Sequence, residues 1–379
     1  MGKPGEVMER ASAVVPLLQA NRSFSEQHAR LAPEIVTALR EAGMFGLAAP
    51  VEVGGAEATL TEIFQATETV ASVDPSAAWY MVNSGGLARA AAWIDPAFWP
   101  EIYLAPLGNF GFSAAPAGRL TASDGGYSLT GTWPLMTGVL DADWALVFCL
   151  LRRPDERPKV RQAAIRTADL QVQEVWQDAV SMRGTGSHVV ATVDLAVPAG
   201  LVVSTTAPAR IDRPLYRCGA FDGPGASNAA VPIGILRGAV TSAAAELKHK
   251  VSSIFGASAS ASTAVLELLA EASVALDILH YGVTGALDAL WDYRERGVDP
   301  PVGLRATVAG SPYHAVEVAR DLVSRLYSRS SRKAFFAGHP LERALRDIHA
   351  VGYGIDVLRP VQHDVGRVTI GLDPVLPGF

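Results

Sequence analysis

The sequence predicts an α+β fold that is mostly helical and has three consecutive parts. Three observations support this prediction. Apolar residues recur at three- and four-residue spacing in residues 1–105, as they do in amphipathic helices. Short apolar runs separated by Gly, Asp and Pro fill residues 106–208, which is typical of an antiparallel barrel or sandwich. Long segments rich in Ala, Leu and Val follow in residues 209–379 and indicate an antiparallel helical bundle.

The first two helices are predicted from the spacing of their apolar residues. They are expected over residues 6–20 and 23–42. Ser23 and Glu26 have the spacing of a capping box, in which the serine caps the helix and the glutamate reaches back to its amide. Ser23 is therefore expected to be the N-cap of the second helix.

Two further helices of the N-terminal part are predicted from their starting residues. One is expected over residues 61–72, with Thr59 or Thr61 as its N-cap. Asp74 is the expected N-cap of the next helix, because Pro75 follows it and proline is accepted at the first helical position.

The middle and last parts are predicted from longer patterns. Strands are expected in the runs YSLTGTW (127–133), DWALVFCLL (143–151), AAIRTADLQVQEV (163–175) and HVVATVDLAVP (188–198). Long helices are expected over residues 229–253, 261–294 and 311–330, with a last helix over 340–352. The turn GVDPPVG at 297–303 separates two of them.

Composition limits the class of protein. The chain has 379 residues and a net charge of −6 without a dominant basic patch, so nucleic acid is not an expected partner. No run of 18 apolar residues and no apolar N-terminal segment occur, so we expect a cytoplasmic protein that does not contact the membrane. Cys149 and Cys218 form no CxxC pair, so both are expected to be buried thiols.

Two segments of the β-rich part carry candidate chemistry. The run DGGYSLTGTWPLMTG (124–138) places a Trp, a hydroxyl and a Gly close together, which would suit a flat ligand that forms hydrogen bonds. A β-hairpin with a core Trp is the alternative interpretation. The run RGTGS (183–187) could bind an anion through its amides and its guanidinium, or it could be a structural turn pinned by Arg183.

Several other kinds of site find no support in the sequence. The run RGTGS is not a phosphate-binding P-loop, because no Gly-Lys-Ser/Thr follows it. The eight histidines show no metal-ligand spacing, so no metal site is expected. No GxSxG motif occurs, so a hydrolase triad is not indicated.

Seven short motifs follow one another along the chain, at residues 50–55, 74–79, 116–118, 125–133, 182–187, 194–198 and 340–347. Taken in this order, they resemble those of the acyl-CoA dehydrogenase superfamily. The chain is more closely similar to the flavin-dependent monooxygenase branch, the two-component (group D) hydroxylases that use reduced flavin from a separate reductase. The resemblance covers nearly the whole chain.

The resemblance implies a fold and an assembly. It implies an N-terminal helical domain (1–105), a middle antiparallel β-barrel domain (106–208) and a C-terminal four-helix bundle (209–379). Proteins of this kind are usually tetramers, so a homotetramer is expected.

The resemblance also implies a cofactor and its binding residues. Reduced FMN or FAD would lie against the loop after residue 131, with Trp133 packed at the ring and Gly138 beside it. The Thr137 hydroxyl or amide would reach the N5/O4 edge, where it could hold a flavin hydroperoxide. The remaining expected cofactor-binding residues are Arg183, Gly184, Thr185, Gly186 and Ser187.

The chain departs from the family at the positions of its catalytic groups. Ile355 occupies the position of the dehydrogenases' carboxylate base, and the first bundle helix (NAAVPIGILRGAV) has no Glu either. Gly354 occupies the position of the histidine that the monooxygenases usually carry, and Asn83 lies where a second histidine is common. Acyl-CoA oxidation is therefore disfavoured.

Three possibilities remain for the missing proton acceptor or donor. Asp356 could replace the base. His363 or His349 could reach in from the C-terminal end of the chain, and of these we favour His363. The substrate could also need no base. Thr137, His363 and Asp356 are thus the candidate catalytic residues.

The favoured function is a reduced-flavin-dependent monooxygenase. It would transfer oxygen from a flavin C4a-hydroperoxide to carbon or nitrogen of a small organic substrate, with secondary metabolism as the expected setting. One alternative is a dehydrogenase of the same fold, which would hold FAD tightly. The other is a repurposed member without redox activity, which would bind no flavin.

Overall fold

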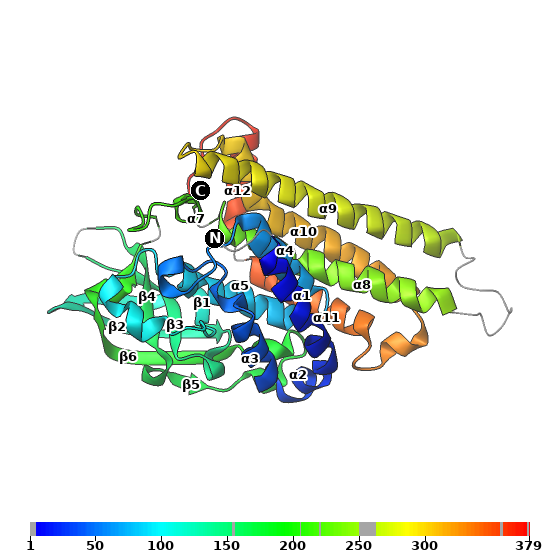
Figure 1. Cartoon of the computed structure of the whole chain (residues 1–379), viewed down its shortest axis with the longest axis horizontal. Helices are drawn as coiled ribbons and strands as arrows, with labels where there is room; N and C mark the ends of the chain where they lie inside the picture. Colours follow the sequence, from blue (N-terminus) through cyan, green and yellow to red (C-terminus); the bar gives the residue numbers. More distant parts are fainter. Residues whose placement is uncertain are drawn as a thin grey trace.

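The computed structural model describes residues 5–153, 156–204, 206–219, 221–249, 263–356, 359–376 and 379. The sheet made by the middle part of the chain lies at one side of the molecule, and the helices from both ends of the chain lie beside and above it (Figure 1). The predicted order of helical, β and helical parts is thus confirmed. No helix within these residues is long and apolar enough to cross a membrane.

Six helices make up the first part of the chain. In α1 the residues Val7, Ala11, Val14 and Leu18 are buried, which is the helical spacing that predicted it. The helices are α1 (Glu6–Ala20), α2 (Arg22–His28), α3 (Pro33–Glu41), α4 (Leu60–Ala71), α5 (Pro75–Ala90) and α6 (Trp99–Ile102).

Two of the predicted helix starts are confirmed. The Thr59 hydroxyl accepts a hydrogen bond from the Glu62 amide, and the Glu62 carboxylate accepts one from the Thr59 amide, so Thr59 is the N-cap of α4. The Asp74 carboxylate accepts a hydrogen bond from the Ala77 amide (3.1 Å) and caps α5, with Pro75 as the first helical residue.

The predicted capping box at Ser23 is wrong. Ser23 lies inside α2 and is exposed, and the predicted single helix over 23–42 is broken. The break occurs because Pro33 lacks an amide hydrogen and restricts Ala32 to an extended conformation. Glu26 instead forms ion pairs with Arg343 and Arg346.

The middle part forms one seven-stranded sheet in the order β5-β6-β2-β1-β3-β4-β7. The strands are β1 (Gly111–Ser123), β2 (Gly126–Met136), β3 (Trp144–Leu151), β4 (Lys159–Arg166), β5 (Gln171–Gln173), β6 (His188–Pro198) and β7 (Val202–Val203). All neighbours are antiparallel except β1 and β3, which are parallel. This one pair differs from the prediction because β2 returns along one side of β1 and β3 then joins the other side.

The last part is a bundle of four long helices with a fifth helix against it. The helices are α7 (Pro214–Arg217), α8 (Ala230–His249), α9 (Thr263–Glu295), α10 (Val302–Arg329), α11 (Pro340–Asp356) and α12 (Arg359–Thr369). Helices α8 to α11 pack on one another, and α12 packs on α10 (Figure 1).

The ends of these helices were predicted less well. Helix α10 begins at Val302 rather than at 311, because Pro312 is accommodated inside it. Helix α12 was not predicted. The predicted helix ends at 253 and 261 lie outside the described residues.

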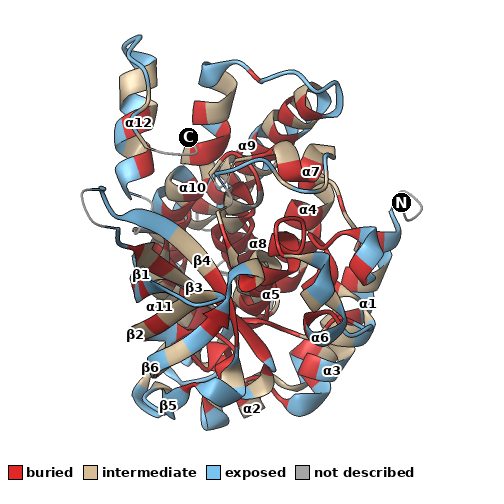
Figure 2. Cartoon of the chain, turned by 90° about the vertical axis from the view of Figure 1, so that its left-hand side faces the viewer, coloured by how far each residue is buried: buried red, intermediate tan, exposed pale blue. Residues whose placement is uncertain are grey.

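The core is continuous between the sheet and the surrounding helices. Figure 2 shows buried residues concentrated along α4, α5 and α8 and in the neighbouring strands β1 and β3. Helix α5 packs against β1, β3 and the turn at residues 183–185. It is therefore the element that can bring side chains of the first part to the sheet.

Candidate active site

A chain of hydroxyl groups joins α5, the end of β2 and the start of β6. Asn83 on α5 donates a hydrogen bond from Nδ2 to Oγ1 of Thr137 (3.1 Å). Thr137 Oγ1 lies 3.1 Å from Ser187 Oγ, and Ser187 Oγ donates to Thr185 Oγ1 at 2.9 Å. Thr185 Oγ1 donates to the carbonyl of Met182 at 2.9 Å. The structure thus brings together the two segments that the sequence singled out.

The turn after β2 is held in place by close packing. Gly138 has φ = 72°, and a Cβ at this position would lie 2.7 Å from the Tyr80 ring. Its amide donates to the carbonyl of Thr185 (3.1 Å), and the Tyr80 hydroxyl donates to Asp141 (2.9 Å). Burial is the main cause that raises the pKa of Tyr80 well above its usual value, so its hydroxyl remains a donor. Glycine is therefore required at position 138, both because of its left-handed backbone conformation and because the Tyr80 ring leaves no room for a side chain.

Beside Thr137, a short apolar segment of the sheet faces solvent. Leu135 is 55% exposed and has φ = 53°, a conformation that is unusual for a leucine. Ala114, Pro116 and Pro134 are also exposed, and Ser113 Oγ donates to the carbonyl of Pro134 (2.9 Å), which ties β1 to β2 here. An exposed apolar surface beside a hydroxyl fits one face and one edge of a flat ring.

Leu135 was missed in the sequence, although a signal for it was present. Trp133 and Met136 are buried while the two residues between them are exposed, so the alternation of the strand is interrupted. The β2–β6 register shifts at the same place, which identifies a bulge. In the run TWPLM two residues separate Trp133 from Met136, and this interruption of the alternation could have indicated the bulge.

The structure corrects the expected position of Trp133. Its side chain is completely buried, and its indole nitrogen donates to the carbonyl of Phe148 (2.8 Å). A Cβ on Gly118 would lie 2.4 Å from the indole, so the ring fills the interior beside β1. The alternative interpretation, a core Trp of a β-hairpin, describes this arrangement.

The Arg183 guanidinium pins its own turn. Its Nε donates to the carbonyl of Glu26 (2.6 Å), and its Nη1 donates to the carbonyls of Gln177 (2.9 Å) and Ala179. Gly184 packs so closely on Ser76 that a Cβ would lie 2.8 Å from it. These hydrogen bonds of Arg183 agree with the structural alternative, in which the guanidinium holds the turn that contains Thr185 and Ser187.

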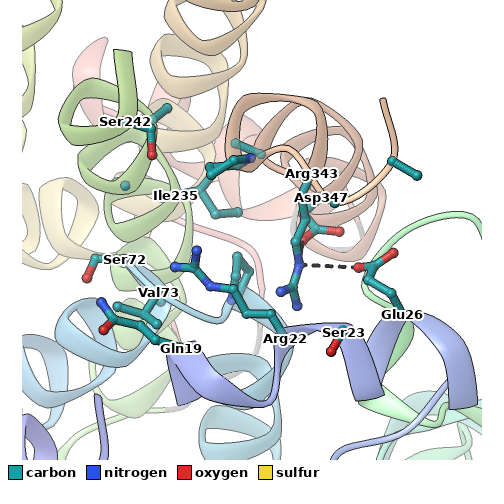
Figure 3. Close-up of a pocket in the computed structure, with 18 of the residues that line it drawn as sticks. Gln19, Arg22, Ser23, Glu26, Ser72, Val73, Ile235, Ser242, Arg343 and Asp347 are labelled. Carbon is teal, nitrogen blue, oxygen red and sulfur yellow. Dashed lines mark ion pairs between the residues drawn. The ribbon is translucent and has the colours of Figure 1, made fainter. Parts of the chain in front are cut away.

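A group of buried ionised residues connects the turn at residues 182–187 to the first and last parts of the chain through a hydrogen bond and ion pairs. Asp347 on α11 accepts a hydrogen bond from the Met182 amide (2.7 Å). Arg343 lies 3.2 Å from Asp74, 3.3 Å from Glu26 and 3.4 Å from Asp347, and Figure 3 shows it beside the last two. Burial is the main cause that raises the pKa of Asp347 to about 6.

A cavity of about 580 Å³ opens beside these ionised residues (Figure 3). It is lined by parts of α1, α2, α4, α8 and α11, with Arg343 and Asp347 at one side. Its lining includes no member of the hydroxyl chain. The cavity is therefore distinct from the candidate site, and the motif at 340–347 positions the site from outside.

The end of α11 lies against α5 near the hydroxyl chain. A Cβ on Gly354 would lie 2.9 Å from the Trp79 ring, so the indole occupies the space that a side chain there would need. Trp79 is one helical turn before Asn83, and both therefore face the same side of α5. Ile355 is buried.

The three residues of the C-terminal part that were considered as the base lie on α11 and α12. Asp356 ends α11, and its side chain lies outside the described residues. His363 is exposed on α12, and His349 is exposed on α11. Neither histidine forms a hydrogen bond with the chain at Thr137 within the described residues.

The two cysteines are buried thiols, as predicted. Both are free, and burial is the main cause that raises the pKa of Cys149 and of Cys218 to about 12. Thiols with such a pKa are inert at neutral pH. Within the described residues no group of three or more His, Cys, Asp or Glu could hold a metal ion.

Comparison with known families matches both ends of the chain. The model for the acyl-CoA dehydrogenase N-terminal domain matches residues 10–93, and the model for the acyl-CoA dehydrogenase C-terminal domain matches residues 226–353. The chain therefore belongs to the acyl-CoA dehydrogenase family.

Its relatives define the branch within that family. The oxygenase subunit HsaA of the flavin-dependent monooxygenase of Rhodococcus jostii (strain RHA1) is 26% identical over 90% of this chain and 92% of its own. The crystal structure of 3-HSA hydroxylase from Rhodococcus sp. RHA1 is 25% identical, covers 99% of both chains and has a TM-score of 0.91. XiaF from Streptomyces sp., in complex with FADH2 and glycerol, is 24% identical over 99% of this chain and 97% of that chain and has a TM-score of 0.89. The chain belongs to the two-component flavin-dependent monooxygenase branch.

Proposed function

We propose that this protein is the oxygenase component of a two-component monooxygenase. It would take reduced FMN or FAD from a separate reductase and transfer one oxygen atom of O₂ to carbon or nitrogen of a small organic substrate, while the other leaves as water. The observation that carries the proposal is the buried hydroxyl chain at Thr137 beside the exposed apolar segment at Leu135.

The residues at this place fit a reduced flavin. The exposed apolar segment, centred on Leu135, would hold one face of the ring system. Thr137, which is 3% exposed, directly follows this segment, and its hydroxyl would contact one edge of the ring. Gly138, Gly184, Thr185, Gly186 and Ser187 would shape the loops behind that edge, and Arg183 would hold those loops together. When bound, reduced flavin supplies the electrons that activate O₂.

The substrate would lie between α5 and the end of α11. Trp79 offers an aromatic surface there, and Asn83 offers an amide that is already bonded to Thr137. A substrate bound there would exclude water, which would protect a reactive oxygen species from side reactions. Ile355 provides no carboxylate, which disfavours the dehydrogenase alternative.

The catalytic roles follow from these positions. Thr137 would hold the reacting edge of the flavin by hydrogen bonding. Asp356 is proposed as the base because it directly follows Ile355 on α11. His363 is the weaker candidate, since it is exposed on a helix that packs on α10.

The deciding experiment is an anaerobic titration of the purified protein with reduced FMN and reduced FAD. We expect tight binding of a reduced flavin, followed by oxygen transfer when O₂, a flavin reductase and candidate substrates are supplied. Protein purified with tightly held FAD would favour the dehydrogenase alternative. Failure to bind either reduced flavin would contradict the proposal and favour a member without redox activity.

The setting of the reaction is part of the same proposal. A separate flavin reductase is the proposed partner. A cytoplasmic location is proposed with it, because the oxygenase component has to receive reduced flavin from that reductase. A role in secondary metabolism would be supported by a reductase gene and biosynthetic genes beside this one.

A further inference from the structure

The cavity between α1, α2, α8 and α11 contains an arginine that has no partner. Arg22 is the first residue of α2, and its half-buried side chain points into the cavity (Figure 3). Its Nε is buried without a hydrogen-bond partner, and no carboxylate of the described residues forms an ion pair with it. Because a charged side chain that is taken out of water is normally paired, Arg22 favours an anion from outside the chain.

A second guanidinium in the wall of the cavity also has groups without partners. Arg343 is only 7% exposed, and its ion pairs with Glu26, Asp74 and Asp347 involve Nε and Nη2. Within the described residues none of its nitrogens has a hydrogen-bond partner, and Nη1 has no ion pair either. A buried donor without an acceptor is costly. Arg343 therefore favours a further acceptor at this cavity.

The two arginines repel each other across the cavity. Burial is the main cause that lowers the pKa of Arg22, and the positive charge of Arg343 lowers it further. The carboxylate of Asp74 offsets part of this effect. The three neighbouring carboxylates are all paired with Arg343, so none of them forms an ion pair with Arg22. A bound anion would stabilise both guanidinium groups at once.

The rest of the cavity suits a small polar molecule. Its volume of about 580 Å³ lies within the usual range of sites for small molecules. Gln19, Ser23 and Ser242 contribute an amide and two hydroxyl groups to the lining, next to apolar residues such as Ile235 (Figure 3). These polar groups can donate hydrogen bonds to the oxygens of an anion. The space is therefore sufficient for an organic acid or a phosphate ester.

From these observations we infer that the cavity is a second binding site, for a small organic anion whose carboxylate or phosphate group pairs with Arg22 and Arg343. The inference goes beyond the proposed function and does not depend on it, because no residue of the hydroxyl chain lines the cavity. Carboxylates and phosphates both present acceptor oxygens that match a guanidinium group, so the experiment distinguishes the two classes.

The experiment measures the binding of two anions to the purified full-length protein by isothermal titration calorimetry. The probes are citrate and inorganic phosphate, in a buffer that contains neither and is kept at one ionic strength with sodium chloride. The variants are Arg22→Gln and Ser242→Leu, of which the second keeps both arginines and fills part of the cavity. Arg119→Gln is the matched control, because Arg119 is exposed on β1 and does not line the cavity.

We expect wild type and Arg119→Gln to bind at least one of the two anions. Tighter binding of citrate would assign the site to carboxylates, and tighter binding of phosphate would assign it to phosphate esters. Arg22→Gln should weaken the binding about tenfold to a hundredfold, which is the effect of losing a hydrogen bond between charged groups. Ser242→Leu should also weaken it, by occupying the space of the ligand. Without an anion, Arg22→Gln should keep the wild-type Tm, because it removes no ion pair of the described residues.

Three results would overturn the inference. The first is a wild-type protein that binds neither citrate nor phosphate. The second is a variant, Arg22→Gln or Ser242→Leu, that binds the anion as tightly as wild type, because the anion would then bind outside this cavity. The third is a clearly lower Tm of Arg22→Gln without an anion, which would show that Arg22 has a partner within the fold. The binding of reduced flavin by the same protein is a separate measurement, and its failure would contradict the proposed function alone.

Discussion

At the scale of single residues, Leu135 combines two features that are each unfavourable in the free protein. Its backbone is left-handed at φ = 53°, and its side chain is 55% exposed. A non-glycine residue in this conformation costs about 1–3 kcal/mol and tends to persist at functional sites. Both features are explained if the side chain is needed as part of a surface for a flat ligand.

Replacing Leu135 should change the stability of the fold and the affinity for reduced flavin in opposite directions. We expect Leu135→Gly to raise the free energy of unfolding by about 1 kcal/mol, because glycine adopts this conformation without strain. The same change should weaken the binding of reduced flavin. Denaturant unfolding and anaerobic titration measure the two effects. Leu104→Gly is the control, since Leu104 is 65% exposed, has no left-handed backbone and should gain no stability. Tighter flavin binding by Leu135→Gly would contradict the role of this surface.

Asp347 leads to a prediction about pH. Its pKa is raised to about 6, mainly by burial, above the ordinary value of 3.8 that it has in the unfolded chain. Between these two values the folded protein binds the proton more tightly than the unfolded chain, so this residue makes folding less favourable as pH rises. Its destabilising effect is complete above pH 6 and is relieved as pH falls toward 4.

The variant Asp347→Asn tests this assignment, because asparagine keeps the acceptor for the Met182 amide and cannot ionise. We expect the unfolding free energy of wild type, measured relative to the variant, to increase as pH is lowered from 7 to 4. Urea unfolding at a series of pH values gives this difference. A difference that is constant with pH would show that Asp347 does not titrate in this range.

At the scale of elements, the turn after β2 decides whether the hydroxyl chain forms. Gly138 and Gly125 both have positive φ, 72° and 78°, but they differ in their surroundings. A Cβ on Gly138 would meet the Tyr80 ring at 2.7 Å, whereas a Cβ on Gly125 would have no atom within 4 Å. A side chain at Gly125 would cause backbone strain alone, whereas a side chain at Gly138 would cause backbone strain and a steric clash. Comparing variants of the two glycines therefore distinguishes the two costs.

We expect Gly125→Ala to lower the free energy of unfolding by about 1–2 kcal/mol, the cost of a left-handed alanine. Gly138→Ala should cost clearly more and should also weaken reduced-flavin binding, because Tyr80 must move away from the turn. Denaturant unfolding of both variants measures the difference. Equal losses would mean that the contact with Tyr80 does not constrain this turn.

Much at this scale could be predicted from the sequence, for a physical reason. Helix starts depend on local side-chain hydrogen bonds, so Thr59 and Asp74 were identified as caps. The sequence pattern could not distinguish Ser23 from these, because the break at Pro33 and the ion pairs of Glu26 decided that helix start. Local spacing does not show which distant residues compete for a side chain.

The candidate site shows the same limit. The order of the motifs predicted that the segments at Thr137 and at 183–187 would meet, and they do. Whether Trp133 points inward or outward depends on a bulge in β2, and the partners of Arg183 depend on where α2 ends. Both are set by tertiary contacts. The hydrogen bond from Asn83 to Thr137 joins residues that are far apart in the sequence, so it could be found only in the structure.

At the scale of the whole molecule, the site depends on contacts among all three parts of the chain. Asn83 comes from the first part, Thr137 and Ser187 from the sheet, and Asp347 from the bundle. Movement of any part would break the hydroxyl chain. The motif at 340–347 therefore stabilises the relative positions of these three parts, because Arg343 forms ion pairs with both Asp74 and Asp347.

One surface of the bundle remains uncovered in the single chain. The long helix α9 exposes Leu266, Val274, Ile278 and Tyr281, which recur at helical spacing on one side. These side chains are 50–71% exposed. Exposed apolar side chains that gather on one side of a helix favour an interface with another protein. A second copy of this chain is the proposed partner, which extends the expectation of a homotetramer.

We therefore expect light scattering at micromolar concentration to give a particle of about four times the chain mass of 39.9 kDa. Ile278→Asp should shift the particle toward a smaller assembly, because an unpaired carboxylate would be buried in the interface. Val193→Asp is the control, since Val193 is 72% exposed on β6, away from the bundle. It should leave the particle mass unchanged. A wild-type particle near 40 kDa would refute the assembly, and an unchanged mass for Ile278→Asp would remove α9 from the interface.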